Sequence, residues 1–135
     1  MALRLPAALL LLAVLLAGCG AGTAKPYTAQ GTAPCLRGKG FTAVTTSAAK
    51  VGFIAGFAAN GGLRATAKDR NVLTIAFTGS SGDVPGTKKA FTRQAAPQYK
   101  HRMDDIMESQ RNAVLVWTVT PSQQQLDAAL GCLSP

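Results

Sequence analysis

The chain has few side chains that could bind a metal ion or exchange a proton. Its 135 residues include one histidine, six acidic residues and three cysteines. It has no closely spaced cysteine pair of the kind that structural zinc sites use. Three of the acids lie close together in the sequence, at Asp104, Asp105 and Glu108. They lack the glycine that a calcium-binding loop requires, and neighbouring Arg102 and Arg111 favour a charge-balanced, solvated surface. We therefore expect no metal and no cofactor.

The sequence also lacks a complete catalytic motif. Residues 79–83, Gly-Ser-Ser-Gly-Asp, are similar to the Gly-x-Ser-x-Gly turn of serine hydrolases, but Asp83 stands where the last glycine is required. A serine nucleophile at Ser81 would need a histidine base. The chain has only His101, and nothing in the sequence places it near Ser81. A small hydrolase that uses Ser81 or a pair of carboxylates is therefore the least favoured function, and we expect no enzyme.

A permanent membrane span is missing as well. The longest apolar run covers residues 7–17, whereas a transmembrane helix needs about 20 apolar residues. The run follows Arg4 and ends in small residues, which is the pattern of a secretory signal peptide over residues 1–18. The chain is therefore expected to leave the cytoplasm.

The end of this signal carries a second pattern. Its last residues and the one that follows are Leu16, Ala17, Gly18 and Cys19. Directly after an apolar run, this sequence resembles the lipobox of bacterial lipoprotein precursors. The resemblance implies cleavage before Cys19, acyl chains on that residue, and an anchor in the extracytoplasmic face of the bacterial cell membrane, where two or more chains bind stably. The alternative is ordinary cleavage before Lys25, after the small residues at 22–24, which would give a freely secreted protein.

Positive charge exceeds negative charge in the chain as a whole. The net charge is +8 and the isoelectric point is near 10.0, which favours anionic partners. The bases form no block and do not alternate with aromatic residues, so we expect no nucleic acid as a partner. The candidate anion-binding residues are Arg64, Lys68, Lys88, Lys89 and Arg93. The alternative, which we favour, is a generally basic surface beside an anionic membrane.

Two cysteines remain if Cys19 carries lipid. They are Cys35 and Cys132, near the two ends of the expected folded region. An exported protein meets an oxidising compartment, where an even number of cysteines indicates disulfides. We therefore expect Cys35 and Cys132 to pair, within one chain or between two copies.

Residue patterning predicts where folded structure begins and which elements it contains. Residues 19–34 are small, polar and unpatterned, so they are expected to form a flexible tether before a single domain at 35–135. The predicted strands cover residues 36–45, 63–68, 73–78 and 113–119, and the predicted helices cover 46–59, 84–96 and a segment from 121 onward. Residues 102–110 fit either a short edge strand, which is slightly favoured, or a helix.

This order of elements predicts an α+β fold. We expect a two-layer sandwich with a mostly antiparallel sheet and helices on one face, similar to a ferredoxin-like βαββαβ arrangement with an added C-terminal helix. Such a fold hosts many functions and does not identify one. The favoured hypothesis is a non-enzymatic, membrane-anchored protein that binds an envelope protein or an anionic surface component. The alternative is a freely secreted basic domain that binds an anionic ligand or polymer.

Overall fold

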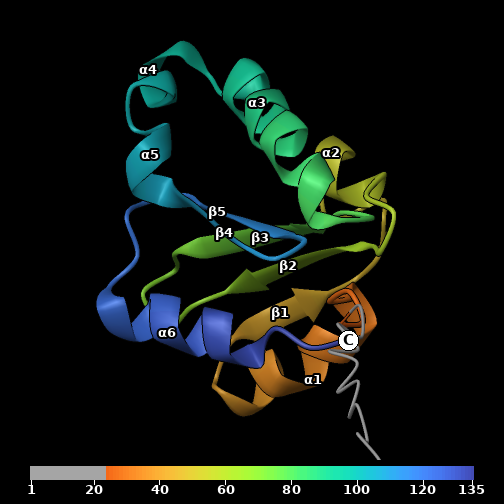
Figure 1. The fold of residues 1–135 in the computed structure, drawn as a ribbon. Coiled ribbons are helices and arrows are strands. Elements are labelled where there is room, and N and C mark those ends of the chain that lie inside the picture. The colour runs from red at the N-terminus through yellow and green to blue at the C-terminus, as the bar shows by residue number, and fades with distance from the viewer. Residues whose placement is uncertain (1–23) are drawn as a thin grey trace, which may run out of the picture.

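A five-stranded antiparallel sheet forms the centre of the molecule (Figure 1). The computed structural model describes residues 24–135. The strands follow the order β1-β2-β3-β5-β4 across the sheet. Their bounds are β1 Thr42–Thr45, β2 Gly62–Thr66, β3 Val72–Phe77, β4 Met107–Gln110 and β5 Ala113–Trp117. The predicted signal peptide, the lipobox with Cys19 and the first residues of the predicted tether lie outside the described residues.

Six α-helices and a short 3-10 turn surround this sheet in the described part of the chain. The helices are α1 Ala29–Gly38, α2 Phe53–Gly56, α3 Val84–Gln94, α4 Pro97–Lys100, α5 Met103–Ile106 and α6 Gln123–Cys132, and the turn η1 covers Ser81–Asp83. Within residues 24–135, none of the helices combines the length and the apolar character needed to cross a membrane.

The predicted hairpin is confirmed as β2 and β3, and its register defines the main core. Leu63 pairs with Ile75 and Ala65 pairs with Leu73, while β5 continues the same rows on the other side of β3. Because side chains alternate across a strand, these residues share one face of the sheet. Trp117 belongs to this face, is 1% exposed and lies 6.3 Å from the ring of Phe41, so it is a core residue.

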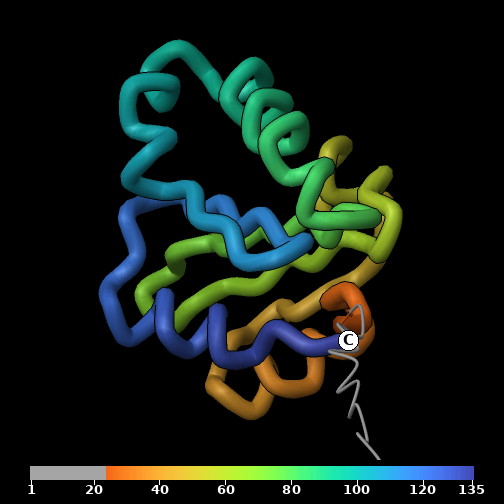
Figure 2. The backbone as a smooth tube through the Cα atoms, viewed as in Figure 1, coloured from red at the N-terminus to blue at the C-terminus, as the bar shows by residue number. Residues whose placement is uncertain are grey.

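The two faces of the sheet are covered by different parts of the chain. Helices α1 and α6 form the helical layer over the main core, and Leu36 and Ala129 are fully buried there. The N-terminal and C-terminal segments therefore lie side by side, as the orange and blue parts of the tube in Figure 2 show. On the opposite face, α2 and α3 pack around Ala76, which joins Val51 and Ala55 in a smaller apolar cluster.

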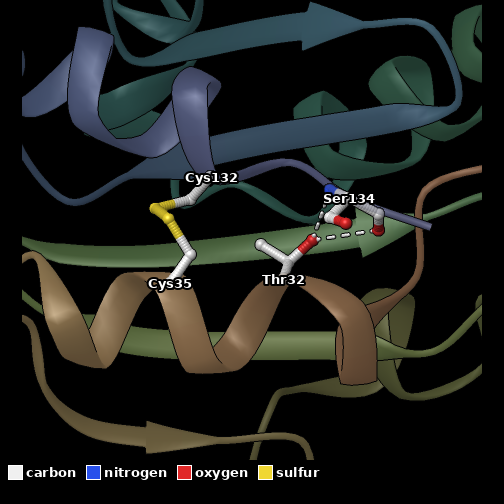
Figure 3. Close-up of a disulfide and its surroundings, with 4 residues drawn as sticks. All are labelled: Thr32, Cys35, Cys132 and Ser134. Carbon is white, nitrogen blue, oxygen red and sulfur yellow. Dashed lines mark hydrogen bonds between the residues drawn. A yellow bond between two sulfur atoms is a disulfide. The ribbon is translucent and has the colours of Figure 1, made fainter.

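A disulfide joins α1 to α6, as the sequence predicted (Figure 3). Cys35 and Cys132 are separated by 97 residues in sequence, and their Cα atoms lie 5.3 Å apart within one chain. Beside the disulfide, the Ser134 N–H donates to Thr32 Oγ1 at 3.1 Å, and that hydroxyl donates to the Ser134 carbonyl. The end of the chain is therefore attached to α1 by covalent and polar contacts.

Folded structure begins earlier than expected. The prediction of a tether through residue 34 and a strand from residue 36 is wrong over α1, which starts at Ala29. Thr28 caps this helix, because its Oγ1 accepts a hydrogen bond from the Gly31 N–H at 2.9 Å. The helix buries Ala29, Thr32, Ala33 and Leu36, which recur at helical spacing.

The helix predicted at residues 46–59 is also wrong for most of its length. Residues 46–52 form turns, and only Phe53–Gly56 is helical. Gly52 has a φ of 90°, outside the right-handed helical region, so it separates the short helix from the preceding residues. Two apolar residues at helical spacing within this range, Val51 and Ala55, are nevertheless buried.

The second half of the chain follows the prediction more closely. The predicted helix at 84–96 is confirmed as α3, the strand at 113–119 as β5, and the C-terminal helix as α6. The ambiguous segment 102–110 contains both alternatives, the helical turn α5 followed by the edge strand β4.

The α+β class and the antiparallel sheet are confirmed, whereas the strand order differs from the ferredoxin-like arrangement. In that arrangement another strand separates the first two, but here β1 lies at the edge and pairs directly with β2. The short α2 cannot serve as the long crossover helix that such a separation requires.

Candidate functional site

Residues of α3, α4, α5 and the end of β5 line an apolar groove. We call it the α3 groove. Figure 1 shows α3, α4 and α5 on the same side of the sheet. The volume of the groove is about 350 Å³, and it is lined by Phe91, Gln94, Ala95, Tyr99, Met103, Ile106, Val116, Trp117 and Thr118. Ligand sites in proteins commonly have volumes of about 300–1,000 Å³ and mainly apolar walls. The groove therefore has the size and surface of a site for a small apolar group.

The elements that form this groove have clear local causes. Helix α3 begins with Val84 and Pro85, a favourable start because proline needs no N–H partner there, and it ends at Gln94, three residues before Pro97. Phe91 and Ala95 are four residues apart, so they lie on the same side of the α3 segment, and both line the groove. Val116 reaches the groove because its neighbours Leu115 and Trp117 face the main core.

A basic cleft lies beside the α3 groove. Its volume is about 420 Å³, and it is lined by Lys88, Lys89, Thr92, Arg93, Asp104 and Met107. Three of the five candidate anion-binding residues therefore come together, on the side of α3 next to the groove. Adjacent residues of the same segments line the two hollows: Phe91 and Met103 face the groove, whereas Thr92 and Asp104 line the cleft. An apolar site and a positively charged site are thus neighbours.

The other two candidate anion-binding residues lie elsewhere. Lys68 joins Lys39 in a polar cleft of about 530 Å³ between the end of α1 and α6. Arg64 is exposed in the middle of β2, opposite Thr74, and lines none of these three hollows. The five bases therefore do not form one patch, and only the α3 set gathers around a cleft.

The candidate hydrolase residues are not assembled. Ser81 and His101 are both exposed, and no hydrogen bond joins them among the described residues. The neighbouring Ser80 caps η1 instead. The N–H and the Oγ of Ser80 both donate hydrogen bonds to the Asp83 carboxylate, each at 3.1 Å. Within residues 24–135 no group of three or more His, Cys, Asp or Glu side chains is placed to hold a metal ion.

The first described residues are attached to one end of the sheet, which we call the proximal end. The Tyr27 N–H donates to Asn112 Oδ1 at 2.8 Å, and Asn112 Nδ2 donates to the Tyr27 carbonyl at 2.9 Å. Arg111 donates to the Lys25 carbonyl at 2.7 Å, and its guanidinium lies 4.2 Å from the centre of the Tyr27 ring. The Gln110 side chain donates a hydrogen bond to the Tyr27 hydroxyl, and this bond lowers the pKa of the phenol. The nearby Arg111 guanidinium lowers it further, by a smaller amount.

Two phenylalanines near the proximal end are exposed, and both lie within the helix that was predicted over residues 46–59. Phe53 is 70% exposed and Phe57 is 80% exposed, and their ring centres lie 4.8 Å apart. Their spacing of four residues correctly predicts contact between the rings. The sequence could not reveal their exposure, because residues 46–52 do not continue the helix and α2 contacts the sheet through Ala55.

Comparison of the chain with protein-family models, curated proteins and solved structures finds no match.

Proposed function

We propose that this chain is a lipid-anchored bacterial envelope protein whose domain binds, without catalysis, an amphipathic anion: an apolar chain that carries an acidic group. The lipid on Cys19 holds the protein on the extracytoplasmic face of the membrane. The α3 groove receives the apolar part of the ligand, and the basic cleft receives its negative charge.

The observation that carries this proposal is the pairing of two hollows on one helix. The groove has apolar walls from α3, α5 and β5, whereas the neighbouring cleft presents Lys88, Lys89 and Arg93. A purely apolar ligand would gain nothing from these charges, and a purely polar anion would gain nothing from the groove. A ligand with both parts uses both surfaces, since apolar burial supplies affinity and opposite charge supplies selectivity.

The groove lies away from the end of the sheet at which the N-terminal segment enters. Strand β5 runs from Ala113, at the proximal end, to Trp117, and the groove lies at this second end, beside Val116 and Thr118. The segment that leads from Cys19 enters at the proximal end, where Tyr27 binds Asn112. A chain anchored through Cys19 would therefore present the groove at the end of the sheet remote from its anchor.

Titration calorimetry of the purified protein with laurate tests the binding function. We expect laurate to bind and its neutral alcohol, dodecanol, to bind more weakly. Ala95→Trp should abolish binding of both, because the indole ring fills the groove. Lys88→Gln, Lys89→Gln and Arg93→Gln should each weaken laurate binding by up to about fivefold, the effect of about 1 kcal/mol for an exposed charge, and leave dodecanol binding unchanged.

Lys68→Gln is the matched control, because this lysine lies in the cleft between α1 and α6. It should leave laurate binding unchanged. Failure of the unsubstituted protein to bind laurate would contradict the proposal, as would equal binding by the Ala95→Trp variant. Binding of inorganic polyphosphate in place of laurate would favour the alternative of a basic domain that binds an anionic polymer.

A further inference from the structure

The exposed phenylalanine pair on α2 is an unusual feature for a soluble surface. Phe53 and Phe57 expose 70% and 80% of their surface and touch one another, so they form one continuous apolar knob. Single exposed apolar residues need no explanation, but two large aromatic rings gathered at one point indicate a contact surface. Lys50, three residues before Phe53, is exposed as well.

The backbone around α2 holds these rings outward. Val51 and Ala55 are 3% and 1% exposed and pack against Ala76 of β3. Gly62 lets α2 approach the sheet, because a Cβ atom at this position would collide with the Ala55 carbonyl oxygen. The inner side of α2 is thus already in contact with the sheet, and the phenylalanines cannot turn inward without displacing it.

The knob lies at the proximal end, where the N-terminal segment enters the domain. The Ala29 N–H donates to the Asn60 carbonyl at 3.1 Å, and Asn60 follows Phe57 by only three residues. The Asn60 N–H in turn donates to the carbonyl of Phe77, the last residue of β3. Figure 2 shows the start of α1, the loop after α2 and the turn between β4 and β5 at the same end of the sheet. Two of the exposed bases, Lys25 and Arg111, belong to this end.

We infer that the proximal end faces the bilayer and that Phe53 and Phe57 insert into the interface of an anionic membrane. This inference rests on the proposed lipid anchor. Only residues 20–26 lie between Cys19 and Tyr27, and seven extended residues reach at most about 25 Å. The anchor therefore keeps this end close to the membrane, where apolar rings insert and neighbouring bases attract anionic headgroups.

Fluorescence quenching by brominated lipids tests the inference. The full-length precursor is expressed in a bacterial host, and the purified protein is reconstituted into vesicles of phosphatidylcholine and phosphatidylglycerol with or without bromine on the acyl chains. Phe57→Trp places a probe in the knob, and Val119→Trp places a matched exposed probe at the opposite end of the sheet, where the Val119 carbonyl binds Asn71. The unsubstituted protein supplies the background from Trp117.

We expect the bromolipids to reduce the emission of the Phe57→Trp probe and to leave that of the Val119→Trp probe unchanged. Replacing Phe53 by serine in the Phe57→Trp protein should reduce the quenching, because one of the two inserting rings is lost. Equal quenching at both positions, or none at position 57, would overturn the inference, and so would self-association of the protein through the knob in place of quenching.

The mass of the same preparations separates this inference from the proposed function. A protein that carries lipid on Cys19 but shows no quenching at position 57 contradicts the membrane-facing knob alone. A protein without lipid contradicts the anchor and with it the inferred orientation.

Discussion

Two buried asparagines hold the loops at opposite ends of the sheet, and each is 3% exposed. Asn112 binds both backbone groups of Tyr27 and also donates to the Thr78 carbonyl at 2.9 Å. Asn71 donates to the Val119 carbonyl at 3.0 Å and accepts from the Val119 N–H at 3.1 Å. Both residues lie between paired strands, but their role in joining distant segments depends on partners that no local pattern identifies.

Replacing Asn112 should therefore be costly. Asn112→Ala removes three hydrogen bonds and leaves buried backbone groups of Tyr27 without partners, so we expect the free energy of unfolding to fall by about 2–4 kcal/mol. Urea denaturation measures this change. Gln124→Ala, at an exposed position of α6, is the control and should change stability by less than about 0.5 kcal/mol. Equal stability of Asn112→Ala and the unsubstituted protein would contradict the role of Asn112.

The Asp69 carboxylate, in the turn between β2 and β3, makes the stability of the protein depend on pH. The Asn71 N–H donates to this carboxylate at 3.0 Å, and this bond, together with the Gln125 side chain, lowers the pKa of Asp69. A carboxyl whose pKa is lowered by folding stabilises the protein above its unfolded pKa, and this stability is lost as the pH falls through the folded pKa. Asp69→Asn keeps an acceptor for the Asn71 N–H but cannot titrate.

We therefore expect the unsubstituted protein to be more stable than Asp69→Asn at neutral pH. The difference in urea midpoint should shrink below the unfolded pKa and disappear below the folded pKa. A difference that persists unchanged in acid would show that the titration of Asp69 does not contribute.

At the level of elements, the disulfide connects two helices that each have a limited apolar face. α1 contains Gly31, Pro34 and Gly38, all poor residues for an isolated helix. Its position is maintained by burial of Leu36 and by attachment to α6 through Cys35. The closed loop spans 97 residues, and such a constraint on the unfolded chain stabilises a protein by about 4–5 kcal/mol in the chain-entropy model.

The double substitution Cys35→Ala and Cys132→Ala should lower the free energy of unfolding by up to that amount. Urea denaturation of the variant beside the oxidised and reduced unsubstituted protein measures it. The reduced protein should resemble the variant. If oxidised protein and variant unfold at the same urea concentration, the disulfide contributes no stability.

The helices and strands differ in how well a local sequence pattern predicts them. The β2–β3 hairpin alternates strictly and was predicted because its signal is local. The signal of α1 was present at Ala29, Thr32, Ala33 and Leu36, but the first three of these residues are small, and Gly31 and Pro34 interrupt the stretch. Gly31 is required by a distant contact, since a Cβ there would collide with the Pro135 carbonyl. Such a contact between the two ends of the chain cannot be read from either end alone.

On the scale of the whole molecule, the described residues form a domain with two distinct ends. The proximal end carries the entering N-terminal segment and the phenylalanine knob, and the α3 groove opens toward the other end of β5. The sequence predicted the cysteine pair, but not the groove, whose walls come from α3, α4, α5 and β5. It singled out the bases of α3 together with Arg64 and Lys68, because composition does not indicate which charges the fold brings together.

The most direct test of the account is the intact mass of the protein from a bacterial expression host, measured with and without reduction beside a Cys19→Ala variant. We predict a chain that begins at Cys19, carries diacylglycerol and gains two hydrogens on reduction, and we predict that Cys19→Ala abolishes both the lipid and this cleavage. A chain that begins at Lys25 without lipid and is unchanged in the variant would contradict the account. The protein would then be a freely secreted basic domain.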